Sequence, residues 1–304
     1  MVKKMYKKVM SVIKKPKLII MKLLRCRLLR FIPDELFLKL MYKLHTGEKL
    51  DLKNPRTFCE KLQWLKLNDR KQEYVTYVDK YAVRTHIAQA IGEKYLIPMI
   101  GIYNSVNEIN WDQLPERFVL KCTHGSNSNI VCTDKSKLDI KEAKRKLKKW
   151  MNQNWYWYGR EWPYKEVKPR IICEEFISSD GNVPEDYKVM CFHGKAKLIQ
   201  VHRDRFSENH TCDIYNTEWE KTGLSKSKDG LPNSDLVLEK PKLLDEMIDL
   251  SEKLSKNMCH ARIDWYIVGD KLYFGEITFY SSSGFSQYDK KEDELLLGSW
   301  INTD

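Results

Sequence analysis

The strongest candidates for catalytic or metal-binding residues lie between positions 262 and 278. Arg262-x-Asp264 and Glu276-x-Thr278 belong to two apolar, aromatic-rich runs, and the segment 268–271 between them (Val-Gly-Asp-Lys) is typical of a β-hairpin turn. Side chains alternate along a strand, so an odd loop such as residues 269–271 would set Asp264 opposite Glu276 and Arg262 opposite Thr278 on one face. A two-residue loop would separate the two acids unless a β-bulge restored the register.

Carboxylates that face each other on a sheet repel unless a cation or a proton lies between them. Mg²⁺ meets this need, because it takes one or two carboxylates and completes its shell with phosphate oxygens and water. Asp264 and Glu276 therefore predict a magnesium site for phosphoryl chemistry. The alternative is an ordinary amphipathic hairpin whose acids face solvent or pair with lysines.

Charge is distributed unevenly along the 304 residues. The formal net charge is +11, yet residues 1–30 hold eleven Lys or Arg and no acidic residue, so the remaining chain carries 42 basic and 42 acidic side chains. Apolar residues interleave with these charges, a composition that suits a helix lying on an anionic membrane surface. Packing of this arm on its own domain is the main alternative, and nucleic-acid binding is the least favoured.

Basic residues also limit how the arm can meet a membrane. Lys17, Lys22 and Arg25 interrupt any run near the roughly 20 apolar residues that a membrane-spanning helix needs, and they argue against a signal peptide. We therefore expect a cytoplasmic protein, peripheral at the inner face of the membrane. The eight cysteines show no C-x-x-C spacing and are expected to be reduced core residues.

The order of the predicted elements indicates an α+β protein of two lobes, because strands and helices do not alternate regularly. We expect a basic arm (1–32), a helical and small α/β region (33–112) and a larger catalytic region (113–304). Capping signals at Asp34 and Thr57 predict two early helices. Further helices are expected over 79–91, from Asp139, over 242–257 and over 289–297, with strands near 95–103, 117–122, 129–133, 170–177, 186–192 and 195–201 and a surface loop over 225–241.

Three segments could bind a nucleotide. Lys121 ends an apolar strand and precedes a loop of small residues (123–129), which includes His124, Gly125 and Ser126, and backbone N–H groups of such a loop can surround phosphates. An ordinary hairpin turn is the alternative for this loop. The strand 171–177 becomes acidic at its end, where a carboxylate can accept the adenine amino group, and Asp186 and Lys188 open the next strand with side chains suited to ribose hydroxyls and phosphate.

The order of these motifs resembles the ATP-grasp superfamily and, within it, the TupA-like branch associated with bacterial surface polysaccharide synthesis. The resemblance covers roughly residue 34 to the end of the chain. It implies that Lys80 and Lys121 bind phosphates, that the loop 123–129 covers them, and that Asp186 contacts ribose. The adenine-binding hinge would comprise Glu174, Glu175, Phe176 and Ile177, and the paired-metal signature would comprise Asp264, Glu276 and Thr278.

Two positions depart from the superfamily pattern. The loop is poorer in glycine than usual, and Thr278 stands where Asn is more common, although a hydroxyl oxygen is still a competent ligand for a hard cation. The resemblance implies an ATP-dependent ligase with two Mg²⁺ ions, in which a carboxylate is activated as an acyl phosphate and then taken by an amine. Arg262 and Lys121 would stabilise the transferring phosphoryl group.

The substrates that this resemblance implies are an amino acid or other amine and a uronic-acid-containing glycan, which could be free, lipid-linked or nucleotide-linked. Arg205 is a cationic candidate for an anionic acceptor, seven aromatic residues between 150 and 164 could stack on sugars, and the segment 281–285 follows the second metal strand. A glycosyltransferase is an alternative, against which the absence of any Asp-x-Asp weighs. A phosphotransferase and a noncatalytic membrane-binding or nucleic-acid-binding module also remain open.

Overall fold

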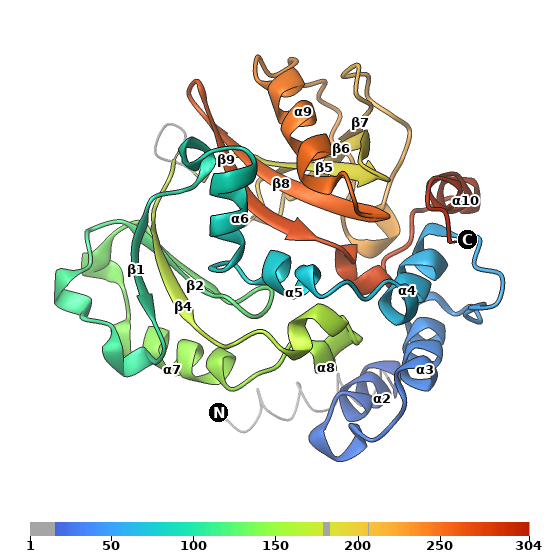
Figure 1. Cartoon of the computed structure of the whole chain (residues 1–304), viewed down its shortest axis with the longest axis horizontal. Helices are drawn as coiled ribbons and strands as arrows, with labels where there is room; N and C mark the ends of the chain where they lie inside the picture. Colours follow the sequence, from blue (N-terminus) through green and yellow to red (C-terminus); the bar gives the residue numbers. More distant parts are fainter. Residues whose placement is uncertain (1–15, 179–182, 206, 304) are drawn as a thin grey trace.

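The computed structural model describes residues 16–178, 183–205 and 207–303. Its strands form two antiparallel sheets (Figure 1), one in the order β1-β4-β2-β3 and the other in the order β7-β6-β5-β8-β9. The predicted α+β class is confirmed. The strands of the first sheet are β1 (Met99–Tyr103), β2 (Phe118–Cys122), β3 (Asn129–Cys132) and β4 (Ile171–Glu175), and those of the second are β5 (Asp186–Phe192), β6 (Lys195–Arg203), β7 (Thr211–Tyr215), β8 (His260–Val268) and β9 (Lys271–Thr278).

Helices cover both sheets. In chain order they are α2 (Pro16–Leu24), α3 (Asp34–Thr46), α4 (Phe58–Asn68), α5 (Glu73–Val78), α6 (Val83–Ala90), α7 (Ile140–Met151), α8 (Tyr156–Gly159), α9 (Leu244–Ser255) and α10 (Lys291–Ser299). The five-stranded sheet packs against α9 through β5, β6 and β8, the four-stranded sheet packs against α7 through β2, and α10 packs on α4. Each sheet thus has its own helical cover and its own apolar cluster.

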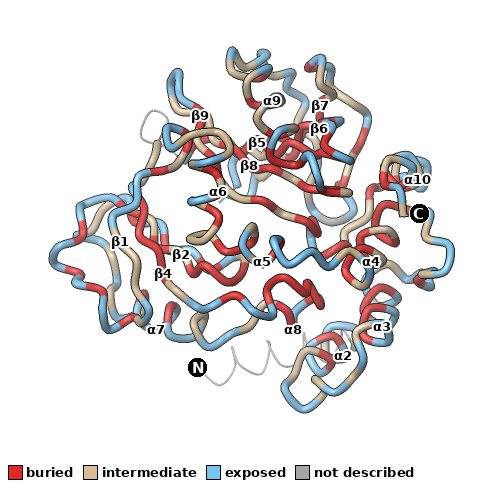
Figure 2. Tube along the Cα trace, viewed as in Figure 1, coloured by how far each residue is buried: buried red, intermediate tan, exposed pale blue. Residues whose placement is uncertain are grey.

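The centre of the five-stranded sheet is its most buried part (Figure 2). Every residue of β5 is buried, although the strand carries both Asp186 and Lys188. Buried charges of this kind are stable only when they are paired. The charged end of β5 therefore marks the place where the sheet carries a polar site.

The predicted ends of the early helices are confirmed, but the predicted buried face of α3 is partly wrong. Thr57 and Glu60 form the predicted capping box at the start of α4, and α3 ends at Gly47 with φ 81°, a left-handed conformation that favours glycine. The apolar spacing over 34–47 predicts an inward face of Leu36, Phe37, Leu40, Met41 and Leu44 for α3. This prediction is wrong in part, because Leu36 and Leu40 are exposed while Leu38 and Tyr42 are buried. The buried stripe runs at positions 37, 38, 41 and 42, so the helix is rotated relative to the prediction.

Two other predicted elements differ from the structure. The helix expected over 79–91 begins only at Val83, because Asp79 ends α5 and its carboxylate accepts hydrogen bonds from the backbone N–H groups of Tyr81 and Ala82. Lys80 consequently lies in a turn between two helices. Strand β7 was not predicted. It is short and contains the buried Asp213, a residue type that is uncommon in strands, so its sequence does not indicate an edge strand.

The basic arm is described only from residue 16 onwards, so residues 1–15, about half of the predicted arm, lie outside the described residues. Met21 and Leu24 of α2 are buried in an apolar cluster with residues of α3. Packing on its own domain therefore holds for one side of α2. None of the helices in the described part of the chain has the length and hydropathy to cross a membrane.

Candidate nucleotide and metal site

The hairpin of β8 and β9 places the predicted residues on one face. Asp264 pairs with Glu276 and Arg262 with Thr278, as expected, but the three-residue loop is wrong. The loop has two residues, since Val268 pairs with Lys271, and the bulge alternative is the one that occurs. Gly275 is the extra residue, and a Cβ there would lie 3.0 Å from the carbonyl oxygen of Asp264. The sequence uses glycine at 275 because two backbones approach closely at the bulge.

The carboxylate of Asp264 is buried and surrounded by cations. Arg262 donates from Nε to Oδ1 at 2.6 Å and from a terminal nitrogen to Oδ2 at 2.8 Å. Lys188, on the neighbouring strand β5, donates to Oδ2 at 2.6 Å. Charge-assisted hydrogen bonds of this length are strong and fix the orientation of the acid.

Glu276 links the hairpin to the turn that carries Lys80. Its carboxylate lies 3.4 Å from Lys80 Nζ and 3.4 Å from Arg262. Burial alone would raise the pKa of Glu276, but Lys80 and Arg262 outweigh burial and lower this pKa to about 2. The hydroxyl of Thr278 donates to Glu276 at 3.3 Å and accepts from Arg262 at 3.2 Å. All four predicted hairpin residues thus belong to one network.

The chemistry of these donors fits Mg²⁺. Asp264, Glu276 and Thr278 offer only oxygen atoms, and Glu276 is ionised at neutral pH. Within the described residues, no group of three or more His, Cys, Asp or Glu side chains gathers as a metal site. The protein would therefore supply two carboxylates and a hydroxyl, and phosphate oxygens and water would complete the shell.

Lys80 also holds the small-residue loop, whose residues 123–128 connect β2 to β3. Its Nζ donates to the carbonyl of Gly125 at 2.7 Å, and its backbone N–H donates to the carbonyl of Thr123. His124 is buried, with Nε2 3.1 Å from the carbonyl of Trp150, while Ser126 is half-buried. The structure brings Lys80 and the loop together as expected, and it turns His124 toward the end of α7.

The hinge strand β4 is tied to the phosphate-binding candidate Lys121. Glu174 forms an ion pair with Lys121 at 2.7 Å and accepts a hydrogen bond from Arg84 of α6 at 2.9 Å. These two ion pairs occupy a side chain of the predicted adenine-binding hinge, and no sequence pattern indicates Arg84 as a partner. The next three residues, Glu175, Phe176 and Ile177, line a cavity instead.

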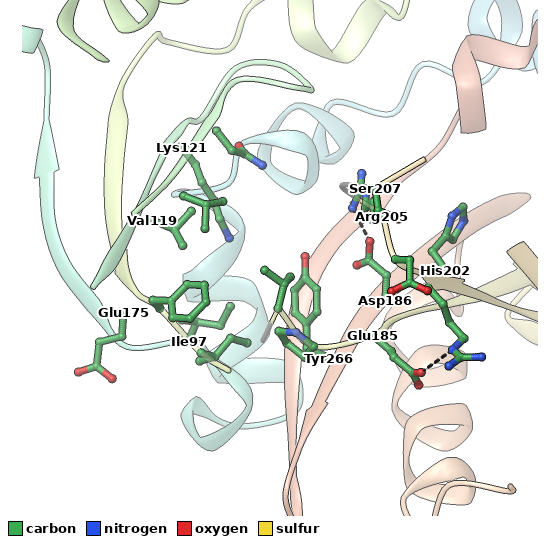
Figure 3. A pocket seen from close by; sticks show the side chains of 18 of the residues that line it. Ile97, Val119, Lys121, Glu175, Glu185, Asp186, His202, Arg205, Ser207 and Tyr266 are labelled. Carbon is green, nitrogen blue, oxygen red and sulfur yellow. Dashed lines mark hydrogen bonds and ion pairs between the residues drawn. The ribbon is translucent and has the colours of Figure 1, made fainter. Parts of the chain in front are cut away.

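That cavity, of about 610 Å³, lies between the two sheets. Figure 3 shows Lys121 and Val119 on one wall, Asp186 with Arg205 on the opposite wall, and Tyr266 between them. Its lining is apolar at the hinge and charged toward β5 and β6, which matches a ligand with a flat ring at one end and an anionic group at the other. Ile97, Val119 and Tyr266 were not predicted as site residues, because isolated apolar residues carry no signal until the sheets face each other.

Asp186 joins the cavity to the hairpin network. It pairs with Arg205 and lies 3.3 Å from Lys188. Burial opposes ionisation of Asp186, but Lys188 and Arg205 hold its pKa below the usual range. His202 lines the same wall, and burial together with Lys188 and Arg262 lowers its pKa to about 2, so this ring is neutral.

A second charged cluster beneath the segment 281–284 was missed by sequence reasoning. Lys66 of α4 is fully buried and donates to the carbonyls of Gly159 (2.8 Å) and Ser283 (2.7 Å) and to Gln63 Oε1 (2.9 Å). Glu161 accepts from the Ser283 hydroxyl at 2.5 Å. A lysine on an amphipathic helix is usually exposed, so only the fold reveals this cluster.

The segment 281–284 follows β9 directly and has an unusual backbone. Ser282 and Ser283 have φ of 50° and 56°, left-handed values that non-glycine residues rarely adopt. The Ser281 hydroxyl lies 3.4 Å from Arg262. Lys66 and Glu161 therefore hold a strained turn against the hairpin site.

Solved structures with similar folds have low identity to this chain. D-alanine–D-alanine ligase from Bacillus anthracis, in complex with ATP, matches at 15% identity and TM-score 0.40 over 74% of this chain and 63% of its own. The same enzyme from Helicobacter pylori matches at 12% and 0.42 over 82% and 68%. ATP-grasp ligase PsnB with its minimal precursor, Mg and ADP matches at 10% and 0.41 over 80% and 65%.

The match thus spans somewhat less than two thirds of the Bacillus anthracis enzyme, and at these scores the likeness adds nothing to the site geometry. Among curated protein sequences, none matches the chain. A family model does match, over residues 60–302, which include the lysine turn, the hinge and the hairpin. The chain belongs to the TupA-like ATPgrasp family.

Proposed function

We propose that this protein is an ATP-dependent carboxylate–amine ligase that joins an amino acid to a uronic-acid-containing surface polysaccharide or to its precursor. The observation that carries the proposal is the network of Arg262, Asp264 and Glu276 with Lys80, beside a cavity that ends in the hinge. Family membership supplies the class of reaction, and Arg205 in the cavity lining supplies a cation for an anionic acceptor.

The residues divide the work of phosphoryl transfer. Glu175, Phe176 and Ile177 form the ring end of the cavity, and Asp186 is placed for ribose hydroxyls. Lys80, Lys188 and Arg262 present positive charge where the phosphates would lie, and such preorganised charge stabilises a phosphoryl group in transfer. Mg²⁺ held by Asp264, Glu276 and Thr278 would neutralise phosphate charge. Arg205 would orient the anionic acceptor.

The lysines that would contact the phosphates are paired with carboxylates in this structure. Lys121 pairs with Glu174, and Lys188 pairs with Asp264 and Asp186. Cations on mobile side chains can exchange a carboxylate for a phosphate oxygen at little cost, since each remains paired. The site is thus charged and ordered before a nucleotide binds.

The proposal also places the protein in the cytoplasm, peripheral at the inner face of the membrane. The charge of residues 1–30 supports this location, because basic residues without acids are attracted to anionic lipid.

Product analysis tests the proposed function. The purified chain with ATP and Mg²⁺ should release ADP only when both an amine and a carboxylate substrate are present, in a screen of amino acids against uronic acids. Mass spectrometry should find an amide. A phosphate ester would make the enzyme a phosphotransferase, and turnover of a sugar nucleotide without ADP release would make it a glycosyltransferase; either result rejects the ligase.

A further inference from the structure

The end of the molecule formed by α2 and the turn after it presents apolar side chains to solvent. Figure 1 shows this part at the edge of the molecule, remote from both sheets. Leu28 is 84% exposed and Phe31 is 79% exposed. Among the large apolar residues that the structure describes, only Val237, at 79%, is as exposed as Phe31. We call the exposed apolar and basic side chains of this region the arm surface: Leu18, Ile20, Leu23, Leu28, Phe31, Lys17, Lys22 and Arg27.

The apolar residues of α2 exceed what its packing needs. Met21 and Leu24 already bury one side of the helix against α3. Leu18, Ile20 and Leu23 remain exposed on other sides. Single exposed apolar residues are normal, but five within fourteen positions form a surface that a partner can cover.

Charge decides what that partner is. A second copy of the chain would bring Lys17, Lys22 and Arg27 against the same three cations, because a two-fold interface sets identical patches together. The preceding residues add further basic side chains and no acid before residue 34. A surface that combines apolar tips with uncompensated positive charge matches an anionic lipid interface. We propose that the arm surface docks on an anionic membrane, with Leu28 and Phe31 entering the interface.

Docking at this place has a consequence for the active site. Arg25 donates to the carbonyl of Tyr158 at 3.1 Å and lies 3.7 Å over its ring, and Arg30 lies 4.7 Å over Trp157. The same aromatic segment reaches Lys66 and Ser283 through Gly159 and Glu161. The arm surface is thus attached to the elements that border the hairpin. Combined with the proposed function, on which this step rests, the arrangement favours a lipid-linked acceptor.

Vesicle sedimentation of the full chain tests the docking. The protein should sediment with phosphatidylcholine vesicles that contain about 30% phosphatidylglycerol and remain in solution with phosphatidylcholine alone. Binding should weaken as salt rises, because the attraction is screened. The double variant Leu28→Ser/Phe31→Ser should lose about ten-fold or more in affinity, since both tips lose their apolar contact. Lys22→Glu/Arg27→Glu should lose at least as much.

Val237→Ser is the matched control, because Val237 is 79% exposed on the loop before α9 and belongs to no part of the arm surface. This variant should bind vesicles like the parent. Equal binding to both lipids, no binding to either, or full binding by the Leu28→Ser/Phe31→Ser variant would overturn the proposal. A dimer in solution that this variant dissolves would assign the surface to a second copy, and preferential binding of DNA would assign it to nucleic acid.

Vesicle binding and ligase activity can be tested separately. Leu28 and Phe31 touch no residue of the nucleotide site, so ADP release with soluble substrates should be the same in the variant and the parent. A chain that binds vesicles but forms no amide would leave the docking intact and reject the ligase. A chain that forms an amide but does not bind vesicles would support the ligase and reject the docking.

Discussion

Two charged clusters lie on either side of the segment 281–284, and they use similar residues differently. In the hairpin cluster acids and bases touch each other directly, as Asp264 and Arg262 do at 2.6 Å, and Glu276 keeps 31% of its side chain exposed. In the buried cluster Lys66 donates only to uncharged oxygens, while Glu161 accepts from the Ser283 hydroxyl and from Trp155. The first cluster can exchange partners with a ligand, and the second cannot.

This difference separates activity from stability. An accessible ion pair adds little to the free energy of unfolding, because water and salt screen it. A buried amine with three carbonyl-type partners is expensive to disturb, because its removal takes a donor away from each of those oxygens. The hairpin cluster should therefore govern turnover, and the buried cluster should govern the folded state and the shape of the turn. Four variants test this contrast.

The largest expected effect is on turnover in Glu276→Gln. The change removes the charge that pairs with Lys80 and Arg262 and weakens a candidate metal ligand, so ADP release should fall by about 100-fold or more. The free energy of unfolding should fall by about 1–2 kcal/mol, because the lost ion pairs stabilise the folded state but the side chain is partly exposed. Steady-state assays and urea denaturation measure the two quantities.

Asp270→Asn is the control for that variant, because Asp270 lies in the two-residue loop of the same hairpin and outside the network. Its turnover should equal that of the parent. Near-normal ADP release by Glu276→Gln would remove the hairpin from the catalytic site.

Lys66→Met should show the opposite pattern. Methionine fills a similar volume but donates no hydrogen bond, so the carbonyl of Gly159 loses its donor and the carbonyl of Ser283 keeps only Gln63 Nε2 at 3.1 Å. We expect a loss of about 2–4 kcal/mol in the free energy of unfolding, measured by urea denaturation. The surface control Lys43→Met should stay within about 0.5 kcal/mol. An unfolding midpoint equal to that of the parent would show that the buried amine does not hold the turn.

Gly275→Ala tests whether the bulge sets the geometry of the hairpin cluster. The new Cβ would lie 3.0 Å from the Asp264 carbonyl oxygen and 3.2 Å from the Tyr266 ring, so Asp264 must shift. We expect a cost of about 1–2 kcal/mol and a several-fold loss in turnover, because small displacements of reacting groups are costly. Gly223→Ala, where a Cβ meets no heavy atom within 4 Å, is the control. Unchanged turnover in Gly275→Ala would mean that the register tolerates a side chain there.

The contrast also explains what could be predicted from sequence. Arg262-x-Asp264 and Glu276-x-Thr278 were readable because alternation along a strand converts spacing into a shared face. The bulge at Gly275 could be anticipated only as one of two ways to keep that face. Lys66, Glu161 and Arg84 were invisible, because their partners lie about a hundred or more residues away in the chain and belong to elements whose docking no local pattern specifies.

The rotation of α3 is a second feature that no local sequence pattern specifies. Leu36 and Leu40 have the helical spacing of a buried stripe, and Leu38 and Tyr42 have it equally well. The choice between the two stripes depends on where α2 and α4 lie. Hydrophobic periodicity thus predicted the helix and left its rotation open.

The smallest expected effect concerns His260, which lies on β8 two residues before Arg262 and contacts no acid. It donates from Nδ1 to the carbonyl of Cys191 at 2.9 Å, and burial lowers its pKa to about 3. The unfolded chain takes up a proton near pH 6.5, while the folded chain keeps the ring neutral, so stability must fall as pH drops below 6.5. The slope for this one group is at most about 1.4 kcal/mol per pH unit. His202, whose pKa is also lowered, acts in the same direction.

In His260→Gln the amide can still donate to Cys191 but takes up no proton in either state. The fall in stability between pH 6.5 and 5, measured by urea denaturation at each pH, should therefore become shallower by up to about 1.4 kcal/mol per pH unit. The remaining fall comes from the other histidines whose pKa values are lowered, which are His86, His124, His202 and His210. The same steepness in variant and parent would mean that the ring is protonated in the folded chain. β8 would then carry a second cation two residues before Arg262, and a charged ring would replace the uncharged packing around Phe58 and Phe192.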